Sequence, residues 1–121
     1  MNDKPLFIER LKKQVLLCDG GTGTLIQAVD WDVDKDFLGL ENCSEILNLT
    51  RPDFVESVHD AYLKAGADCI ETNTFGANKI VLAEFDLVEK TYELNVVATQ
   101  IARKMADRYS TPTQPRYGLG S

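Results

Sequence analysis

Three separate segments of the sequence carry residues that could hold a small polar ligand. Each follows an apolar run and supplies carboxylates, hydroxyls, an amide or glycine backbone: residues 19–22, 71–74 and 120–121. If the apolar runs are parallel strands, their carboxyl ends meet on one face, where α/β proteins hold their ligands. The pattern therefore predicts one polar rim, although the same residue types are also common in ordinary turns.

The glycine-rich segment after the first apolar run is not a nucleotide-binding motif. Gly21-Thr22-Gly23 begins like a dinucleotide fingerprint, but Ile26 stands where the third glycine belongs. No Gly-Lys-Ser/Thr follows, which excludes a P-loop. We expect this loop to let its backbone approach a ligand closely, because glycine has no Cβ.

Cysteine and histidine offer little catalytic chemistry. Cys18 and Cys69 lie in apolar runs and are predicted to be small buried thiols. Cys43 has no second ligand at a metal-binding spacing. His59 is the single histidine; it lies beside the apolar stripe of a helix and is predicted to be a surface or boundary residue. A nucleophile–base triad therefore has no support.

The elements that must position the rim alternate between strand and helix. Apolar runs ended by turn residues predict strands at residues 15–19, 68–72 and 116–121. Pro52 opens a helix that Gly66 ends. Its apolar stripe is predicted to comprise Phe54, Val58, Ala61, Tyr62 and Ala65. Further helices are expected over residues 1–14, around residues 80–85 and over residues 88–108.

The segment between the first strand and Pro52 is polar, and we expect irregular structure there with one helical turn at residues 25–28. The order β, α, β, α, β predicts a parallel sheet with right-handed crossovers. Both an open doubly wound sheet and a closed (β/α) barrel satisfy this order.

Composition restricts the classes of partner. The 121 residues suit one domain, and the net charge of −6 argues against duplex nucleic acid and anionic lipid. No apolar stretch approaches the ~18 residues of a membrane span. Charges spread over the first 14 residues argue against a signal peptide. We therefore expect a cytoplasmic protein that binds neither nucleic acid nor membrane.

Ordered motifs covering the chain from about residue 14 resemble the homocysteine S-methyltransferase family. They are residues 16–24, 45–53, 65–75, 93–95 and 115–121. The residues of these motifs are most similar to those of the N-terminal homocysteine module of the cobalamin-dependent methionine synthases. This resemblance implies a (β/α)₈ TIM barrel of ~250 residues. The chain would then supply its N-terminal portion, about three βα units, with a lead-in helix at 1–14 and a partial homocysteine-binding barrel domain at 15–121.

The resemblance also implies methyl transfer to the thiol of homocysteine to make methionine, by an enzyme of which this chain is one part, inactive alone. Zinc on cysteine thiolates would activate the thiol, and methylcobalamin would donate the methyl group. The family's zinc cysteines lie beyond Ser121, so no catalytic residue, zinc or methylcobalamin is expected on this chain. The remainder of the barrel and the cobalamin and folate modules would be its partners.

Six residues that match the family motifs are expected to bind homocysteine: Asp19, Gly20, Gly21, Asn73, Thr74 and Ser121. Asp19 would pair with the substrate ammonium, and the two glycines would offer backbone close to it. A non-catalytic α/β module that binds a small amino acid is the alternative function, and a plain interaction domain is a third. Because three strands leave open sheet edges, we expect the chain alone to be marginal, oligomeric or aggregation-prone.

Overall fold

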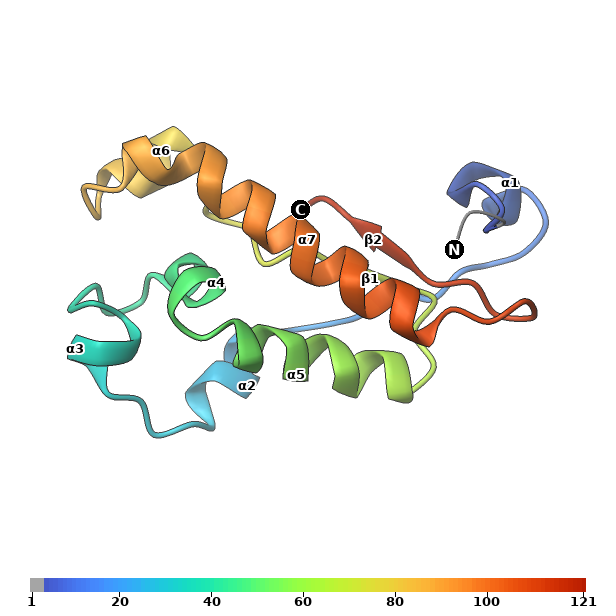
Figure 1. Cartoon of the computed structure of the whole chain (residues 1–121), viewed down its shortest axis with the longest axis horizontal. Helices are drawn as coiled ribbons and strands as arrows, with labels where there is room; N and C mark the ends of the chain where they lie inside the picture. The colour runs from blue at the N-terminus through green and yellow to red at the C-terminus, as the bar shows by residue number, and fades with distance from the viewer. Residues whose placement is uncertain (1–3) are drawn as a thin grey trace.

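The computed structural model describes residues 4–121 and shows an α/β arrangement (Figure 1). Its sheet pairs β1 (Cys69–Glu71) with β2 (Tyr117–Leu119) in parallel, with Cys69 opposite Tyr117. On the other edge of β1, Cys18 forms an isolated parallel bridge with Cys69. The spatial order of the three segments therefore follows their order along the chain, and the predicted parallel α/β class is confirmed.

The first strand is shorter and more exposed than predicted. Within residues 15–19 only Cys18 forms a bridge, although the Leu17 carbonyl accepts the N–H groups of Asp68 (2.8 Å) and Cys69 (3.0 Å). Val15 is 85% exposed and Leu17 62% exposed, so the prediction of a strand buried on both faces is wrong. Cys18 is exposed as well, whereas Cys69 is buried as predicted. The described residues leave the side chains of Val15 and Leu17 largely uncovered, so these apolar groups lie in solvent.

Two helices cover the same face of β1. Ile70 is fully buried in a cluster with residues of α5 (Pro52–Lys64) and α7 (Thr91–Tyr109): Leu63, Ala102, Met105 and Ala106. In a doubly wound sheet, strand order reverses at a switch point and helices occupy both faces. Sequential strand order with both crossover helices on one face is found in a (β/α) barrel and equally in one βαβαβ half of a doubly wound sheet, so these three strands fit both alternatives.

The bounds of α5 are confirmed, but its buried face is only partly the predicted one: Val58 is buried, and Phe54 and Tyr62 are half-buried. Pro52 is the first residue of the helix, and Gly66 follows it with a φ of +108°. Ala61 and Ala65 are exposed, while the buried residues of α5 are Val55, Val58, His59 and Leu63. Alanine adds little apolar area, so packing of the larger side chains sets the phase of the helix. His59 is therefore buried, and its prediction as a surface or boundary residue is wrong.

The region before α7 and α7 itself agree with the sequence pattern. A short helix, α6 (Lys79–Ala83), is capped by the Asn78 side chain, which accepts the N–H groups of Ile80 and Val81. The 3₁₀ turn η2 (Val88–Lys90) leads into α7. The buried residues of α7 include Leu94, Ala98, Ile101 and Met105, which recur at helical spacing along one face.

The segment expected to be irregular contains short helices and supplies part of the larger core cluster. The helices are α2 (Gly23–Gln27), α3 (Val33–Asp36), η1 (Ser44–Ile46) and α4 (Leu47–Thr50). Cys43, Ile46 and Leu47 are fully buried there, in a cluster that also includes Phe37 and Leu94. This segment has few buried apolar residues among many polar ones. Its hydrophobic periodicity is therefore too weak to predict these helices.

The lead-in helix expected over residues 1–14 is present only as α1 (Phe7–Leu11), and residues 1–3 lie outside the described residues. The division of the chain at residues 14 and 15 therefore stays a prediction. Within residues 4–121, none of the helices is both long enough and apolar enough to cross a bilayer.

Candidate functional site

The three predicted rim segments meet around one hollow of about 330 Å³. Its walls come from the first strand segment and α2, from the loop around η1, from the end of β1 and from the end of the chain. They comprise Asp19, Gly20, Thr22, Gly23, Ile26, Ser44, Glu45, Glu71, Thr72, Asn73, Thr74, Phe75 and Ser121. Five of the six predicted homocysteine-binding residues line it, and Gly21 does not. A volume of this size suits a small ligand.

Asp19 joins the first segment to the end of β1. Its N–H group donates to the Cys69 carbonyl (2.9 Å), and its Oδ2 accepts the N–H group of Glu71 (3.0 Å). Burial raises the pKa of Asp19, and the nearby Glu71 carboxylate raises it further, against the lowering effect of the backbone hydrogen bond. A cation bound between the two carboxylates would offset the cost of burying the charged Asp19 and would reduce the repulsion between Asp19 and Glu71.

Asn73 connects the end of β1 to the loop that carries η1 and α4. Its Nδ2 donates to the Ser44 carbonyl (3.0 Å) and to Asn48 Oδ1 (3.4 Å), and Asn48 Nδ2 donates back to the Asn73 carbonyl (2.8 Å). Asn48 is 1% exposed, so this exchange satisfies polar groups that would otherwise be costly to bury. The amide nitrogen of Asn73 therefore has a structural use beside its predicted place in the pocket.

The hydroxyls at the end of β1 tie in the end of the chain. Thr72 Oγ1 and Thr74 Oγ1 are hydrogen-bonded at 2.7 Å, and both side chains are buried. The Ser121 N–H group donates to Thr72 Oγ1 at 3.2 Å. Ser121 is thereby held at the rim next to Thr74, as the sequence predicts.

The glycine loop rests against α5. The Tyr62 hydroxyl donates to the Gly21 carbonyl at 2.6 Å. A Cβ on Gly20 would lie 3.2 Å from the same hydroxyl oxygen, so the contact is close. Gly21 thus contributes to the site by anchoring the loop rather than by lining the hollow. Tyr62 was predictable only as an apolar helix residue, because nothing in its spacing indicates a hydrogen bond to the loop.

The charge of the hollow is entirely acidic among its lining residues. Asp19, Glu45 and Glu71 line it, and neither lysine nor arginine does. Glu45 is already engaged, because its Oε1 accepts the N–H group of Gly76 (2.8 Å). The hollow therefore suits the cationic end of a small molecule, which Asp19 and Glu71 would face, while exposed backbone and hydroxyls remain for neutral or anionic groups.

Comparison with known proteins gives the same family as the motifs. A family profile described as Homocysteine S-methyltransferase matches residues 16–121. The chain belongs to the homocysteine S-methyltransferase family. It is 46% identical over 123 aligned positions to a methionine synthase of Mycobacterium tuberculosis and 47% identical over 115 to one of Mycobacterium leprae, covering 98% and 95% of this chain. The chain spans about 10% of the length of each of these relatives.

Solved structures of the family share the fold. The metallated form of the homocysteine methyltransferase MmuM from Escherichia coli superposes with a TM-score of 0.71 at 25% identity, over 93% of this chain and 39% of that one. Its oxidized form gives a TM-score of 0.69 at 26% identity, over 92% of this chain and 37% of that one. The arrangement in Figure 1 thus resembles part of a homocysteine methyltransferase.

Two of the three thiols of this family member are poorly suited to metal binding. Cys43 and Cys69 are fully buried, and burial raises the pKa of both, that of Cys69 to about 12. A metal ligand must be a thiolate, which such burial disfavours. No group of three or more His, Cys, Asp or Glu side chains within residues 4–121 is placed to hold a metal ion. These residues do not fit zinc.

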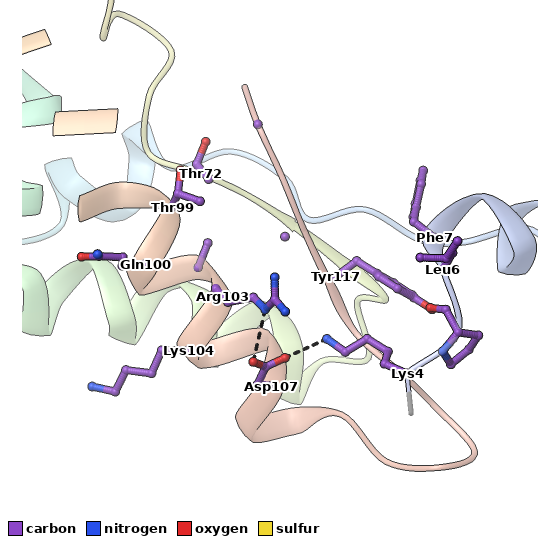
Figure 2. A pocket seen from close by; sticks show the side chains of 14 residues that line it. Lys4, Leu6, Phe7, Thr72, Thr99, Gln100, Arg103, Lys104, Asp107 and Tyr117 are labelled. Carbon is purple, nitrogen blue, oxygen red and sulfur yellow. Dashed lines mark hydrogen bonds and ion pairs between the residues drawn. The ribbon is translucent and has the colours of Figure 1, made fainter. Parts of the chain in front are cut away.

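A larger groove of about 1040 Å³ runs along α7 and β2 (Figure 2); none of the six predicted site residues lines it, although Thr72 lines both this groove and the rim hollow. At one end Lys4 Nζ donates to Asp107 (2.9 Å) and to the Arg116 carbonyl (2.7 Å). The groove borders the edge of β2 that faces away from β1. Alternate residues of a parallel strand bond to the same neighbour, and Gly118, which lines the groove, lies between two residues that bond to β1. Its size follows from this free edge and not from a cluster of reactive side chains.

Proposed function

We propose that this chain is the homocysteine-positioning part of a methionine synthase-type homocysteine S-methyltransferase, built as the first βα units of a TIM barrel. The rim hollow would hold the amino-acid end of homocysteine. Asp19 would pair with its ammonium, the backbone at Gly20 would lie close to it, and Asn73, Thr74 and Ser121 would line the rest. Gly21 would act indirectly, through its bond to Tyr62.

One observation carries this proposal: segments more than 100 residues apart in sequence, from Asp19 to Ser121, bring an acidic pair, buried hydroxyls and glycine backbone to one small hollow. Family membership supplies the substrate class. The acidic pair suits an ammonium group, and an amino acid carries one at neutral pH. The closed barrel is supported by family membership and by the likeness to MmuM, and the parallel strand order fits it.

The complete reaction needs more than residues 4–121 hold. The family resemblance assigns zinc and methylcobalamin to the whole enzyme, where the homocysteine thiol loses its proton and its sulfur accepts a methyl group. Because the residues described do not fit zinc, the part of this chain in the reaction is to bind and orient the substrate. The zinc site and the cobalamin and folate modules belong, in this proposal, to the remainder of the enzyme.

Calorimetric titration tests the proposal. Homocysteine should bind the chain, whereas 4-mercaptobutyrate, which lacks only the ammonium, should bind at least tenfold more weakly, because a charge-assisted hydrogen bond contributes roughly 1.5–3 kcal/mol. Asp19→Asn should remove most of this preference. Asp30→Asn is the matched control, because Asp30 is exposed and lines neither the rim hollow nor the groove of Figure 2.

Two results would count against this function. Equal binding of homocysteine and 4-mercaptobutyrate would show that the ammonium is not recognised. Equal binding of alanine, serine and homocysteine would favour the alternative, a module that binds small amino acids without serving methyl transfer.

A further inference from the structure

His59 is a buried histidine whose ring has no hydrogen-bond partner among the described residues. The residue is 3% exposed, and neither Nδ1 nor Nε2 contacts a donor or an acceptor. It lies on the buried face of α5 between Val55 and Leu63. Leaving a buried polar atom unpaired costs about 1–3 kcal/mol, so such an atom calls for an explanation.

The ring is neutral at physiological pH. Burial lowers the pKa of His59 to about 4, against a smaller raising effect of the Glu56 carboxylate on the same helix. Glu71, on β1, is the charged residue that faces the same cavity. A neutral imidazole has one N–H donor and one nitrogen acceptor, so it can bind a water molecule from either nitrogen.

A small cavity separates His59 from the rim. It offers about 20 Å³ to the centre of a water molecule, which is enough for one. Its polar lining residues are Thr22, His59, Glu71 and Asn73, and the others are apolar. Thr22, Ile26, Glu71 and Asn73 line the rim hollow as well, so these four residues border both cavities.

The polar groups around this cavity leave suitable partners for a water. Thr22 precedes α2, and its side chain makes no capping bond to that helix. Both hydrogens of the Asn73 amide are used by Ser44 and Asn48, so this side chain can offer only its oxygen. A water with a ring nitrogen, a hydroxyl and an amide oxygen around it would have the two to four bonds usual for buried water.

We propose that this cavity is a binding site for one ordered water, through which His59 positions Thr22 and Asn73 behind the rim hollow. His59 is then a positioning residue: it does not touch the ligand, but it fixes two residues that line the hollow. The water site stands on the geometry alone. Its effect on homocysteine affinity rests in addition on the proposed function.

NMR spectroscopy tests the water site without any ligand. Because His59 is the only histidine, its ring gives a single set of imidazole signals. We expect a neutral ring with a cross-peak to a long-lived water. In His59→Leu the Asn73 side-chain amide signals should shift and exchange faster, and in His59→Gln, which keeps a donor and an acceptor, they should stay near those of the parent. Absence of the water cross-peak, or equal Asn73 signals in both variants, would overturn the proposal.

Homocysteine titration then tests the positioning role. Thr22→Val removes the hydroxyl at nearly constant volume, and Thr24→Val is its matched control, because Thr24 is exposed and lines neither cavity. His59→Leu and Thr22→Val should each weaken homocysteine binding about tenfold, the effect of one lost hydrogen bond, and His59→Gln and Thr24→Val less than threefold. Unchanged affinity in both of the first two would refute positioning. If the parent does not bind homocysteine, the proposed function fails, and the NMR result still decides the water site.

Discussion

The carboxylate of Asp19 lies half-buried between the backbone of β1 and the side chain of Glu71. Burial raises the pKa of Asp19 above its ordinary value of 3.8. Between pH 3.8 and the raised pKa, the folded state therefore holds a proton that the unfolded chain has lost. The free energy of unfolding falls as the pH rises through this range. A bound ligand cation would offset the cost of burying the ionised carboxylate. Asp19 therefore lowers the stability of the free protein but favours binding of a cation.

Asp19→Asn should therefore unfold at a higher temperature than the parent at pH 7, because the amide oxygen still accepts the Glu71 N–H group without a charge. The difference should shrink as the pH falls toward 3.8. Thermal unfolding followed by circular dichroism between pH 3.5 and 7 measures it, with Asp30→Asn as the control. A lower unfolding temperature for Asp19→Asn at pH 7 would be inconsistent with the burial cost.

Gly76 is required where Glu45 reaches under the loop after β1. A Cβ at this position would lie 2.6 Å from Glu45 Oε1 and 3.0 Å from Val81 Cγ1. Gly76→Ala should reduce the free energy of unfolding by about 1–3 kcal/mol, as overpacking usually does. Gly23→Ala is the control, since nothing lies within 4 Å of its Cβ and its φ is not positive. Equal urea midpoints for the two variants would contradict this account.

Residue types at strand ends were enough to predict most of the rim, because parallel strands always bring those ends together. They could not predict that Ser44, Glu45 and Asn48 contact the loop after β1, since these residues come from a polar segment without a clear period. Nor could they predict the burial of His59. The burial of His59 depends on which side of α5 faces the core, and the apolar pattern placed that side too close to Ala61.

At the scale of elements, one side chain of β1 packs against both long helices. Ile70 is fully buried against both α5 and α7. Ile70→Ala should lower the free energy of unfolding by about 2–5 kcal/mol through lost burial and a cavity. Ile80→Ala is the matched control, because Ile80 is 85% exposed. Chemical denaturation measures both, and a similar loss in both variants would place the core elsewhere.

Long amphipathic elements were predictable, and short ones were not. α7 and α5 have the length and the end signals that make a helix readable, including Pro52 and Gly66. The helices between residues 23 and 50 are three to five residues long and depend on tertiary contacts from Ile46 and Leu47. Helices this short have too little periodicity to detect and are not stable without packing.

At the scale of the whole molecule, exposed apolar surface and a free strand edge should make the isolated chain self-associate. Val15 is 85% exposed and Leu17 62% exposed, and the edge of β2 opposite β1 borders the groove of Figure 2. Light scattering after size-exclusion chromatography should show species larger than the 13.5 kDa monomer that increase with concentration. A monodisperse monomer with a sharp, reversible thermal transition would contradict this expectation.

The central claim is that the rim hollow receives the ammonium of homocysteine at Asp19. The most direct test is to follow the Asp19 carboxyl carbon by NMR across an acid titration, with and without homocysteine. A bound ammonium favours the ionised carboxylate, so homocysteine should lower the pKa of Asp19, and 4-mercaptobutyrate should not. An Asp19 pKa that homocysteine leaves unchanged at saturating concentration would contradict the account.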